Sequence, residues 1–482
     1  MAVDTTREDT DGPFVNEDVD PSMPGSHLAP KESADLARLP TLEPTENLTR
    51  AVVLRDVRMI HRAWFEYLAV AAGGKVASFN GAHTTYNPMG LGSANIAFPH
   101  LQRDEVGQTL DELIDWCGAQ GRWSIIGCWT GGRPTRALGA ALLARGFDWA
   151  WEPHWMALRL EDLPPQSEMP HGLEIVVDPP ASLWDANPHP YYGQSSPELS
   201  RAKAQLLTMA HSMAGSTRHS VRRVRHTVAL KKGKPVGAAV TFQVGNVIGL
   251  FDVGVLPSER NRGIGTIVTS FALHTAHKDG ASRSILNATP LGEFVYRKLG
   301  FQSLGRGQTY WLHQDVFAKG APHPDTVRFV EALGDQDVET LEKLLPGLQS
   351  RFADGIDVTL PCGLRPVEIA GKLRATLSAK WLAEKGAVLD VLTACDLGLR
   401  GRVPSLLKAK PEIADHRIGS ERATALHYAA AWGDTQLVSW LLEAGADATI
   451  ADETYRSTPA GWARHFGHHA LADRIESHLA GS

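Results

Sequence analysis

A glycine- and arginine-rich turn, ERNRGIGT at residues 259–266, lies between an apolar strand pattern and an apolar helix pattern. Residues 247–257 read as a buried strand, and residues 267–273 read as the start of a helix. Such a strand–turn–helix directs unpaired amide groups and the positive end of the helix dipole at one place. Because Gly263 and Gly265 have no Cβ, a ligand can approach this backbone closely. The turn therefore predicts a binding site for an anion.

Length and composition limit what the rest of the chain can be. At 482 residues the chain is too long for one ordinary core, so two to four domains are expected. The net charge of -6 gives no electrostatic reason to expect nucleic acid as a partner. No apolar run reaches the roughly 18 residues that a membrane span needs, and the N-terminus lacks an apolar signal core. The four cysteines form no zinc pattern, which favours a reducing, cytoplasmic setting and no metal.

The chain divides by pattern into an N-terminal tail and three folded regions. Residues 1–48 are acidic and rich in Pro, Ser and Thr, and we expect them to be disordered. Residues 49–165 contain an amphipathic helix pattern at 58–74, a second helix pattern at 136–147 and strand patterns, ending at a Pro-rich linker. Residues 173–315 carry the glycine turn, and residues 325–480 are helical and repetitive.

The region 173–315 reads as a strand meander followed by the strand–turn–helix. A further strand over 282–288 and a short helix over 292–300 follow. The remaining segment, 301–315, predicts a final hairpin.

Two motifs in this region resemble the GNAT superfamily of acyl-CoA-dependent N-acyltransferases. Residues 260–265 match the family's Arg/Gln-x-x-Gly-x-Gly/Ala turn, and ATPLGEFVYRKLGF at 288–301 resembles its helix that bears a tyrosine before Leu-Gly-Phe. The resemblance covers about 140 residues and implies an α/β fold of the α+β kind, with a mixed, mostly antiparallel sheet and helices. The turn is not a dinucleotide fingerprint, because its first glycine is missing and the preceding strands are linked by hairpins.

The resemblance implies that acetyl-CoA, or another acyl-CoA, is the co-substrate and that a primary amine accepts the acyl group. The pyrophosphate would lie on the turn, at Arg260, Asn261, Arg262, Gly263, Ile264, Gly265 and Thr266. One of the two arginines is expected to point to water. The pantetheine arm would pair with the preceding strand, at Val253 and Val255.

Tyr296 and Asp252 are the candidate catalytic residues. Expelling a thiolate requires a proton, and a phenol with an ordinary pKa near 10 can supply it beside the sulfur. The resemblance assigns this role to Tyr296, with an aromatic residue packed before Leu-Gly-Phe as the alternative. Asp252 is the acid on the strand from which the family often takes its base, or it instead faces the acceptor or solvent. We expect His219 and His226 to be surface or core histidines.

The region 49–165 partly parallels the second one, since WSIIGCWTGGRPTRALGAALLARGF resembles the strand, loop, helix and Gly-Phe of SRSILNATPLGEFVYRKLGF. It lacks the Arg-x-x-Gly-x-Gly turn. We interpret it as a degenerate GNAT-like domain that shapes the acceptor site, or simply as a packing domain.

The C-terminal region resembles ankyrin repeats. TALHYA at 424–429 matches the family's Thr-Pro-Leu-His-x-Ala with Ala425 in place of proline, and the pattern recurs about 34 residues later at Thr458. The resemblance implies an all-α ankyrin solenoid that binds a protein partner or docks on the enzyme.

The sequence thus predicts a cytoplasmic acyl-CoA-dependent N-acyltransferase, acting by direct attack in a ternary complex, with C-terminal ankyrin repeats. The alternative is a non-catalytic CoA-sensing or scaffold protein that acts through those repeats.

Overall fold

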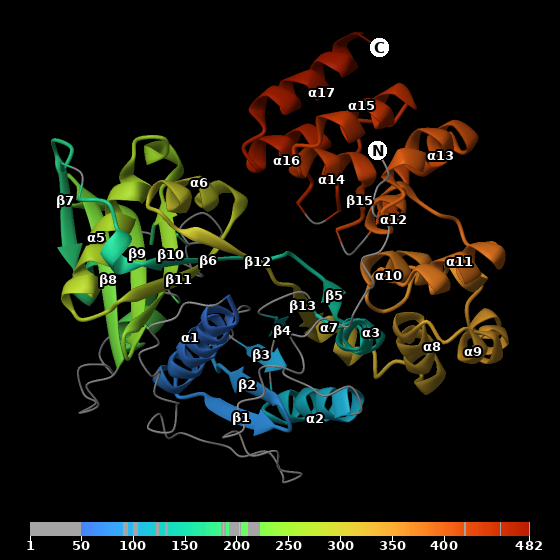
Figure 1. The fold of residues 1–482 in the computed structure, drawn as a ribbon, viewed down its shortest axis with the longest axis horizontal. Coiled ribbons are helices and arrows are strands. Elements are labelled where there is room, and N and C mark those ends of the chain that lie inside the picture. The colour runs from blue at the N-terminus through green and yellow to red at the C-terminus, as the bar shows by residue number, and fades with distance from the viewer. Residues whose placement is uncertain are drawn as a thin grey trace. The chain divides into compact units, whose positions relative to one another are not determined.

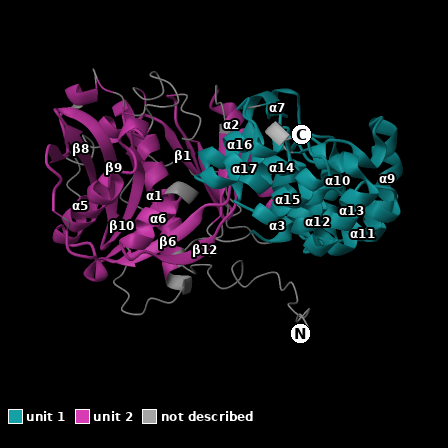
Figure 2. Ribbon diagram, turned by 90° about the horizontal axis from the view of Figure 1, so that it is seen from above, with its two compact units in different colours: residues 1–12, 134–150, 310–482 teal, residues 13–133, 151–309 magenta. Residues whose placement is uncertain are grey.

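The computed structural model contains two compact units, each built from segments that are distant in the sequence (Figure 2). Among the described residues, unit 1 comprises those within 134–150 and 310–481, and unit 2 comprises those within 50–133 and 151–309. The structure describes residues 50–481 apart from 90–94, 100–104, 122–124, 131–133, 167, 185–186, 188, 192–201, 203, 211–221, 419–420 and 454. The acidic tail expected over 1–48 and His219 lie outside the described residues. Within them, no helix is long and apolar enough to cross a membrane.

A seven-stranded sheet forms one layer of unit 2, with strand order β12-β6-β11-β10-β9-β8-β7 (Figure 1). Its strands are β6 (His154–Arg159), β7 (Leu173–Val177), β8 (Arg222–Lys231), β9 (Lys234–Val244), β10 (Val247–Val255), β11 (Arg283–Ala288) and β12 (Gln302–Arg306). β10 and β11 are parallel, and every other neighbouring pair in this sheet is antiparallel. The mixed, mostly antiparallel sheet agrees with the predicted fold class.

The final hairpin predicted over 301–315 is wrong. β12 pairs with β6, whereas β13 (Thr309–His313) pairs with β5 (Asp148–Trp149). Between β12 and β13 the chain forms a hydrogen bond with a distant segment, because the Gly307 amide donates to the Pro153 carbonyl at 2.9 Å. Alternation of apolar residues indicates which face of a strand is buried but does not choose its partner strand. Turn residues at 305–307 therefore suggested a local pairing that the fold does not make.

Helices cover both faces of the seven-stranded sheet (Figure 1). α5 (Ile264–Lys278) and α6 (Pro290–Lys298) share one apolar cluster with Met156 of β6. α1 (Arg50–Ala71) lies in the cluster that includes Trp155, the neighbouring residue of the same strand. Because successive side chains of a strand point to opposite faces, the two clusters lie on opposite sides of the sheet.

A second group of strands lies in unit 2, with α1 and α2 (Val106–Ala119) packed against it. Its strands are β1 (Lys75–Phe79), β2 (Ala82–Tyr86), β3 (Ile96–Pro99) and β4 (Ile125–Trp129). β2 pairs antiparallel with β1 and β3, and β4 pairs parallel with β3.

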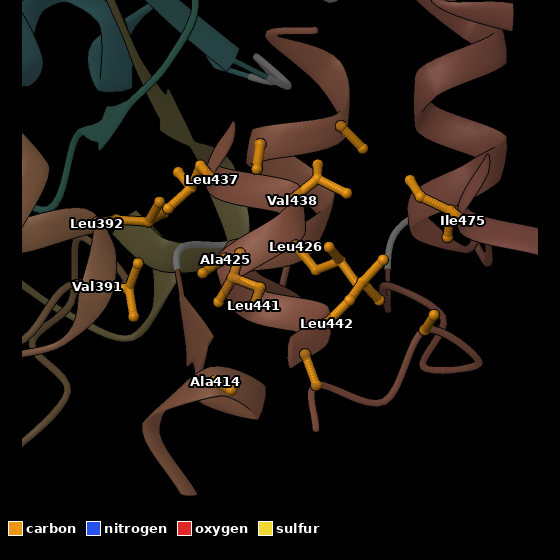
Figure 3. Packing of buried hydrophobic residues seen from close by; sticks show 14 of the residues in the cluster. Val391, Leu392, Ala414, Ala425, Leu426, Leu437, Val438, Leu441, Leu442 and Ile475 are labelled. Atoms are coloured by element: carbon orange, nitrogen blue, oxygen red, sulfur yellow. The ribbon is translucent and has the colours of Figure 1, made fainter. Parts of the chain in front are cut away.

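Unit 1 is mainly helical. Its helices are α3 (Arg136–Ala144), α7 (Gln314–Ala318), α8 (Pro324–Asp335), α9 (Val338–Arg351), α10 (Pro366–Lys372), α11 (Thr376–Glu384), α12 (Val391–Asp396), α13 (Val403–Ala409), α14 (Ala425–Ala431), α15 (Thr435–Glu443), α16 (Pro459–His465) and α17 (His469–Gly481). A short hairpin joins β14 (Arg417–Ile418) and β15 (Ala423–Thr424). Aliphatic side chains from α12, α14, α15 and α17 meet in one buried cluster (Figure 3).

His427 links two successive repeats of this array. Its Nδ1 accepts a hydrogen bond from the Thr424 amide at 3.1 Å, so its Nε2 carries the proton and donates to the Ser457 carbonyl at 3.1 Å. Thr458 begins the next repeat by accepting a bond from the Gly461 amide at 3.3 Å. The threonines that marked the repeat in the sequence are therefore both the N-caps of helices.

Helix α3 packs tightly on α8 inside unit 1. Gly334 of α8 is the closest point, because a Cβ built on it would lie 2.5 Å from the Ala140 Cβ and 3.1 Å from the Arg136 carbonyl oxygen. One of these neighbours is backbone and the other is the first side-chain carbon, so neither can rotate away. The helices that follow residue 324 thus pack against a helix from the first third of the chain.

His61 of α1 lies in an aromatic cluster on the face of the seven-stranded sheet that α1 covers. Its ring makes an edge contact with Trp155 at 4.6 Å between centroids and lies 5.0 Å from Phe251. Its Nε2 is 3.3 Å from the amide nitrogen of Asn287. Complete burial lowers the pKa of His61 to about 3, because the site disfavours the charged imidazolium.

We predict that Gly334→Leu lowers the free energy of unfolding by about 1–3 kcal/mol, the usual cost of overpacking a tight contact. Gly401→Leu is the matched control, because a Cβ on Gly401 would meet no atom within 4 Å. Urea denaturation of both variants measures the difference. Equal stability of the two variants would show that α3 and α8 are not in close contact.

We also predict that the free energy of unfolding falls at acid pH because of His61. The folded-state pKa of His61 lies below the value near 6.5 of an unfolded chain, so below pH 6.5 the unfolded chain binds a proton that the folded chain does not. This contribution to stability is complete above pH 6.5 and is lost as the pH falls toward 3. It amounts to about 2 kcal/mol between pH 7 and pH 5. Unfolding free energies measured at both pH values should therefore drop more for the native chain than for His61→Phe. An equal drop would place His61 in contact with water.

Candidate active site

β10 and β11 diverge well before the glycine turn. Their parallel pairing covers three residue pairs, the last between Gly249 and Ile285, while β10 continues along β9 to Val255. A Cβ on Gly249 would lie 2.3 Å from the Phe251 ring and 2.4 Å from the Ile60 Cγ2. Glycine is therefore required where the two strands diverge.

Asp252 lies at an irregularity of β10 beyond this point. The register against β9 shifts between Phe251 and Gly254, and Asp252 has a φ of 50°, in the left-handed region. The bulge redirects the end of the strand. Val253 and Val255, the residues expected beside a pantetheine arm, are half-buried against the cluster that holds α5.

The turn itself ends at a helix start without a side-chain cap. Asn261 and Gly263 have φ values of 60° and 76°, and α5 begins at Ile264. Gly263 is the N-cap and has no side chain to accept a bond from the first amides of the helix. A Cβ on Gly263 would meet no atom within 4 Å, so the space before the helix is open. Ile264 is buried, whereas Gly265 and Thr266 are half-buried. The first amides of α5 therefore lie at an open, uncapped helix start, and the binding of an anion there stays a prediction.

The charges around the turn are partly balanced by Glu259. Lys231 Nζ lies 2.9 Å from a Glu259 oxygen, and Arg262 Nη1 lies 3.5 Å from the same oxygen. The hydrogen bond from Lys231 is the main reason that the pKa of Glu259 is lowered. Arg260 donates through Nε to the Val255 carbonyl at 3.3 Å, which fixes it along the end of β10. Three cations and one carboxylate therefore leave the turn with an excess of positive charge.

Tyr296 lies on α6 inside the apolar cluster that α5 and α6 share. Only 7% of it is exposed, and its ring makes an edge contact with Phe301 at 5.8 Å between centroids. Burial, and then the neighbouring Tyr191 phenol, raise the pKa of Tyr296. The phenol is therefore protonated at neutral pH, as a proton donor must be, and it also packs in the core as the alternative interpretation required.

Tyr191 is a residue that sequence reasoning missed. Its backbone lies against β10, since a Cβ on Gly254 would come within 2.7 Å of the Tyr191 nitrogen. Tyr191 is 44% exposed, and the pKa of its phenol is raised by partial desolvation and then by the Asp252 carboxylate. Tyr191 also acts electrostatically on Tyr296. Tyr191 therefore lies near both Asp252 and Tyr296.

A buried histidine pair holds the segment that carries Tyr191. His189 Nδ1 accepts a bond from the Tyr191 amide at 3.2 Å, so a neutral His189 donates through Nε2 to His226 Nε2 at 3.0 Å. Desolvation, followed by the nearby His226, keeps the pKa of His189 well below its usual range. Trp184 stacks on His226 at 5.0 Å. His226 is thus a core histidine, one of the two expected outcomes for it.

Several solved structures are similar to this chain at low identity. A GCN5-related N-acetyltransferase from Kribbella flavida is 17% identical, with a TM-score of 0.41 over 54% of this chain and 95% of its own. A tandem GNAT protein from the clavulanic acid biosynthesis pathway is 14% identical, with a TM-score of 0.36 over 54% and 96%. A GCN5-related N-acetyltransferase from Sphaerobacter thermophilus is 15% identical, with a TM-score of 0.35 over 50% and 80%.

Family models match two separate parts of the chain. A search of curated proteins gave no match. Residues 183–301 match the model of the acetyltransferase (GNAT) family, and residues 421–453 match that of the ankyrin repeat. The first range contains the glycine turn, Asp252 and Tyr296, and the second contains the repeat joined by His427. Both resemblances are confirmed: the chain carries a GNAT acetyltransferase domain followed by an ankyrin repeat in its C-terminal helical region.

Proposed function

We propose that this protein is an acyl-CoA-dependent N-acyltransferase that transfers an acetyl group from acetyl-CoA to a primary amine of a small molecule or a protein. The observation that carries the proposal is the uncapped start of α5 beside the diverging end of β10. The match to the GNAT family supports acyl transfer in general. Acetyl as the acyl group, the amine as acceptor and the roles of the residues below are our proposals.

The turn fits a diphosphate. The open space before Gly263 and the first amides of α5 supply the anion site, and the positive charges nearby favour it. The residues that would line it are Arg260, Asn261, Arg262, Gly263, Ile264, Gly265 and Thr266. Val253 and Val255 would pair with the pantetheine arm through their backbone groups, on the side where β10 has left β11.

Tyr296 would donate its phenolic proton to the sulfur of the leaving thiol. Burial raises the pKa of Tyr296, so the phenol keeps its proton at neutral pH and would release it only to the developing thiolate held beside it. Asp252 would accept the proton that the attacking amine must lose, directly or through water. The amine would attack while both substrates are bound, so that much of the rate comes from holding it beside the thioester.

The C-terminal repeats favour a second candidate function, that of a scaffold acting through its ankyrin region. Trp432 is 52% exposed and Tyr455 is 67% exposed. Exposed aromatic side chains are enriched at surfaces that bind proteins. On this alternative the GNAT domain would sense CoA without catalysing transfer.

The remaining parts of the chain have supporting roles in the proposal. The range 49–165 is divided in the fold, because residues 134–150 belong to unit 1 and β6 belongs to the seven-stranded sheet. Strands β1 to β4, with α1 and α2, would be the degenerate GNAT-like part that shapes the acceptor site. We place the enzyme in the cytoplasm, with no nucleic acid, membrane or metal required.

Release of free CoA from acetyl-CoA distinguishes the acyltransferase from the CoA sensor or scaffold. The full chain is incubated with acetyl-CoA and a panel of amines, aminoglycosides and peptides, and free CoA is measured against a sample without acceptor. Acceptor-dependent release supports the enzyme. Binding of CoA without release from any acceptor class would favour the sensor or scaffold.

We predict that Gly263→Glu abolishes measurable CoA binding in calorimetry, because it directs a negative side chain into the proposed phosphate site. Gly280→Glu is the matched control: it also has a positive φ and open space around the Cβ position, but it lies just after the opposite end of α5. Both changes strain the backbone similarly. Unchanged affinity in a folded Gly263→Glu protein would remove the proposed binding site.

We also predict that Tyr296→Phe lowers kcat by about tenfold to a thousandfold, within the range of general-acid contributions, with little change in KM for acetyl-CoA. Phenylalanine keeps the ring contact with Phe301 and the core volume while removing the proton donor. Steady-state kinetics with a rate-limiting chemical step measures this. If kcat is unaffected, Tyr296 serves packing alone.

A further inference from the structure

Three side chains outside the proposed acyl-CoA site form a nucleophile–base–acid arrangement. His154 of β6 lies with its Nε2 2.6 Å from the Ser303 Oγ of β12. The other ring nitrogen, Nδ1, lies 2.9 Å from a Glu293 oxygen of α6. All three residues belong to unit 2, and none of them lies in the glycine turn.

The sheet register brings the three together on one face. His154 lies opposite Ala288 of β11 and Arg306 of β12, and Ser303 lies opposite Met156. His154 and Met156 alternate with Trp155, so both point to the face that α6 covers. Glu293 reaches His154 from that helix.

With a neutral His154, the contacts are those of an activated serine. Burial alone would raise the pKa of Glu293, but hydrogen bonds from Arg297 and His154 hold it below its usual value. A Glu293 carboxylate only accepts, so His154 donates to it through Nδ1 and leaves Nε2 as an acceptor. Nε2 can then receive the Ser303 hydroxyl proton.

His154 is buried, whereas the serine that it contacts is exposed. His154 is 5% exposed and so is shielded from water, while Ser303 is exposed on the edge strand. Arg306, the cross-strand partner of His154, leaves the sheet on the same face and is exposed. A positive group near Ser303 would favour an oxyanion there.

We propose that Ser303 is a nucleophile for small carboxylic esters, activated by His154 and Glu293, at a second site independent of acyl-CoA transfer. Ser303 Oγ forms a bond to the ester carbonyl carbon and passes its proton to His154 Nε2. The carbon–oxygen bond to the alcohol breaks, and the alcohol leaves with that proton. Water then hydrolyses the acyl-serine, with His154 again accepting and returning a proton, so that one ester and one water give one acid and one alcohol.

The test uses a fluorophosphonate probe and p-nitrophenyl acetate on the full chain. The probe should label Ser303, identified by peptide mass spectrometry, with loss of fluoride from phosphorus. Ester hydrolysis should fall by roughly tenfold or more in Ser303→Ala and in Glu293→Gln.

Ser282 provides the matched control. It is also exposed, but its Oγ bonds to the Asn246 amide nitrogen at 2.9 Å instead of a histidine. Ser282→Ala should keep full probe labelling and ester hydrolysis. Thermal unfolding of each variant checks that the fold is retained.

Three results would overturn the proposal: labelling at other serines, hydrolysis unchanged in Ser303→Ala, or labelling of Ser303 that is unchanged in a folded Glu293→Gln protein. The last result would show an exposed hydroxyl that is not activated. CoA affinity is measured in parallel and should be unaffected by Ser303→Ala, so failure of either site is distinguished from failure of the other.

Discussion

Helix α1 packs against the residues at which β10 and β11 part, and the arrangement of unit 2 depends on this contact. Ile60 occupies the space beside Gly249, the last residue of β10 that pairs with β11. One turn earlier, Asp56 forms a buried ion pair with Arg283, the first residue of β11. Removing either charge would leave the other buried without a partner, which costs about 3–5 kcal/mol. The helix thus holds the two strands together at one end while they diverge toward the other.

The divergence of β10 from β11 links the packing of α1 to the proposed acyl-CoA site. Beyond Gly249, β10 bulges at Asp252, and the chain turns at Gly263 into the uncapped start of α5. Strained or unpaired backbone of this kind is retained where the surrounding structure fixes it, and it is frequent at functional sites. Phe251, the residue before the bulge, packs against His61 and Trp64 of α1.

The local features of the site were predictable from the sequence because they depend on near neighbours. The glycine turn, the helix that starts at Ile264 and the helix bearing Tyr296 all follow from short-range patterns. The same holds for Thr424 and Thr458, which cap helices of the repeats.

The pairing of segments that are distant in the sequence could not be predicted from such short-range patterns. Nothing in the apolar alternation of β6 indicates that it lies between β11 and β12. Tyr191 comes to the site through a histidine pair with His226, 37 residues from His189 in sequence. The packing of α3 on α8 joins residues almost 200 positions apart, at Ala140 and Gly334. Such pairings are decided by the whole fold and leave no periodic signal.

The central claim is that the first amides of α5 hold the diphosphate of CoA, and amide hydrogen exchange measures this directly. Exchange of Gly263 to Thr266 is followed by NMR with and without saturating CoA, with the amides of α8 in unit 1 as an internal reference. Slower exchange and shifted resonances are expected at Gly263, Ile264 and Gly265 when CoA is added, with no change in α8. Identical exchange at these amides in the presence of bound CoA would contradict the claim.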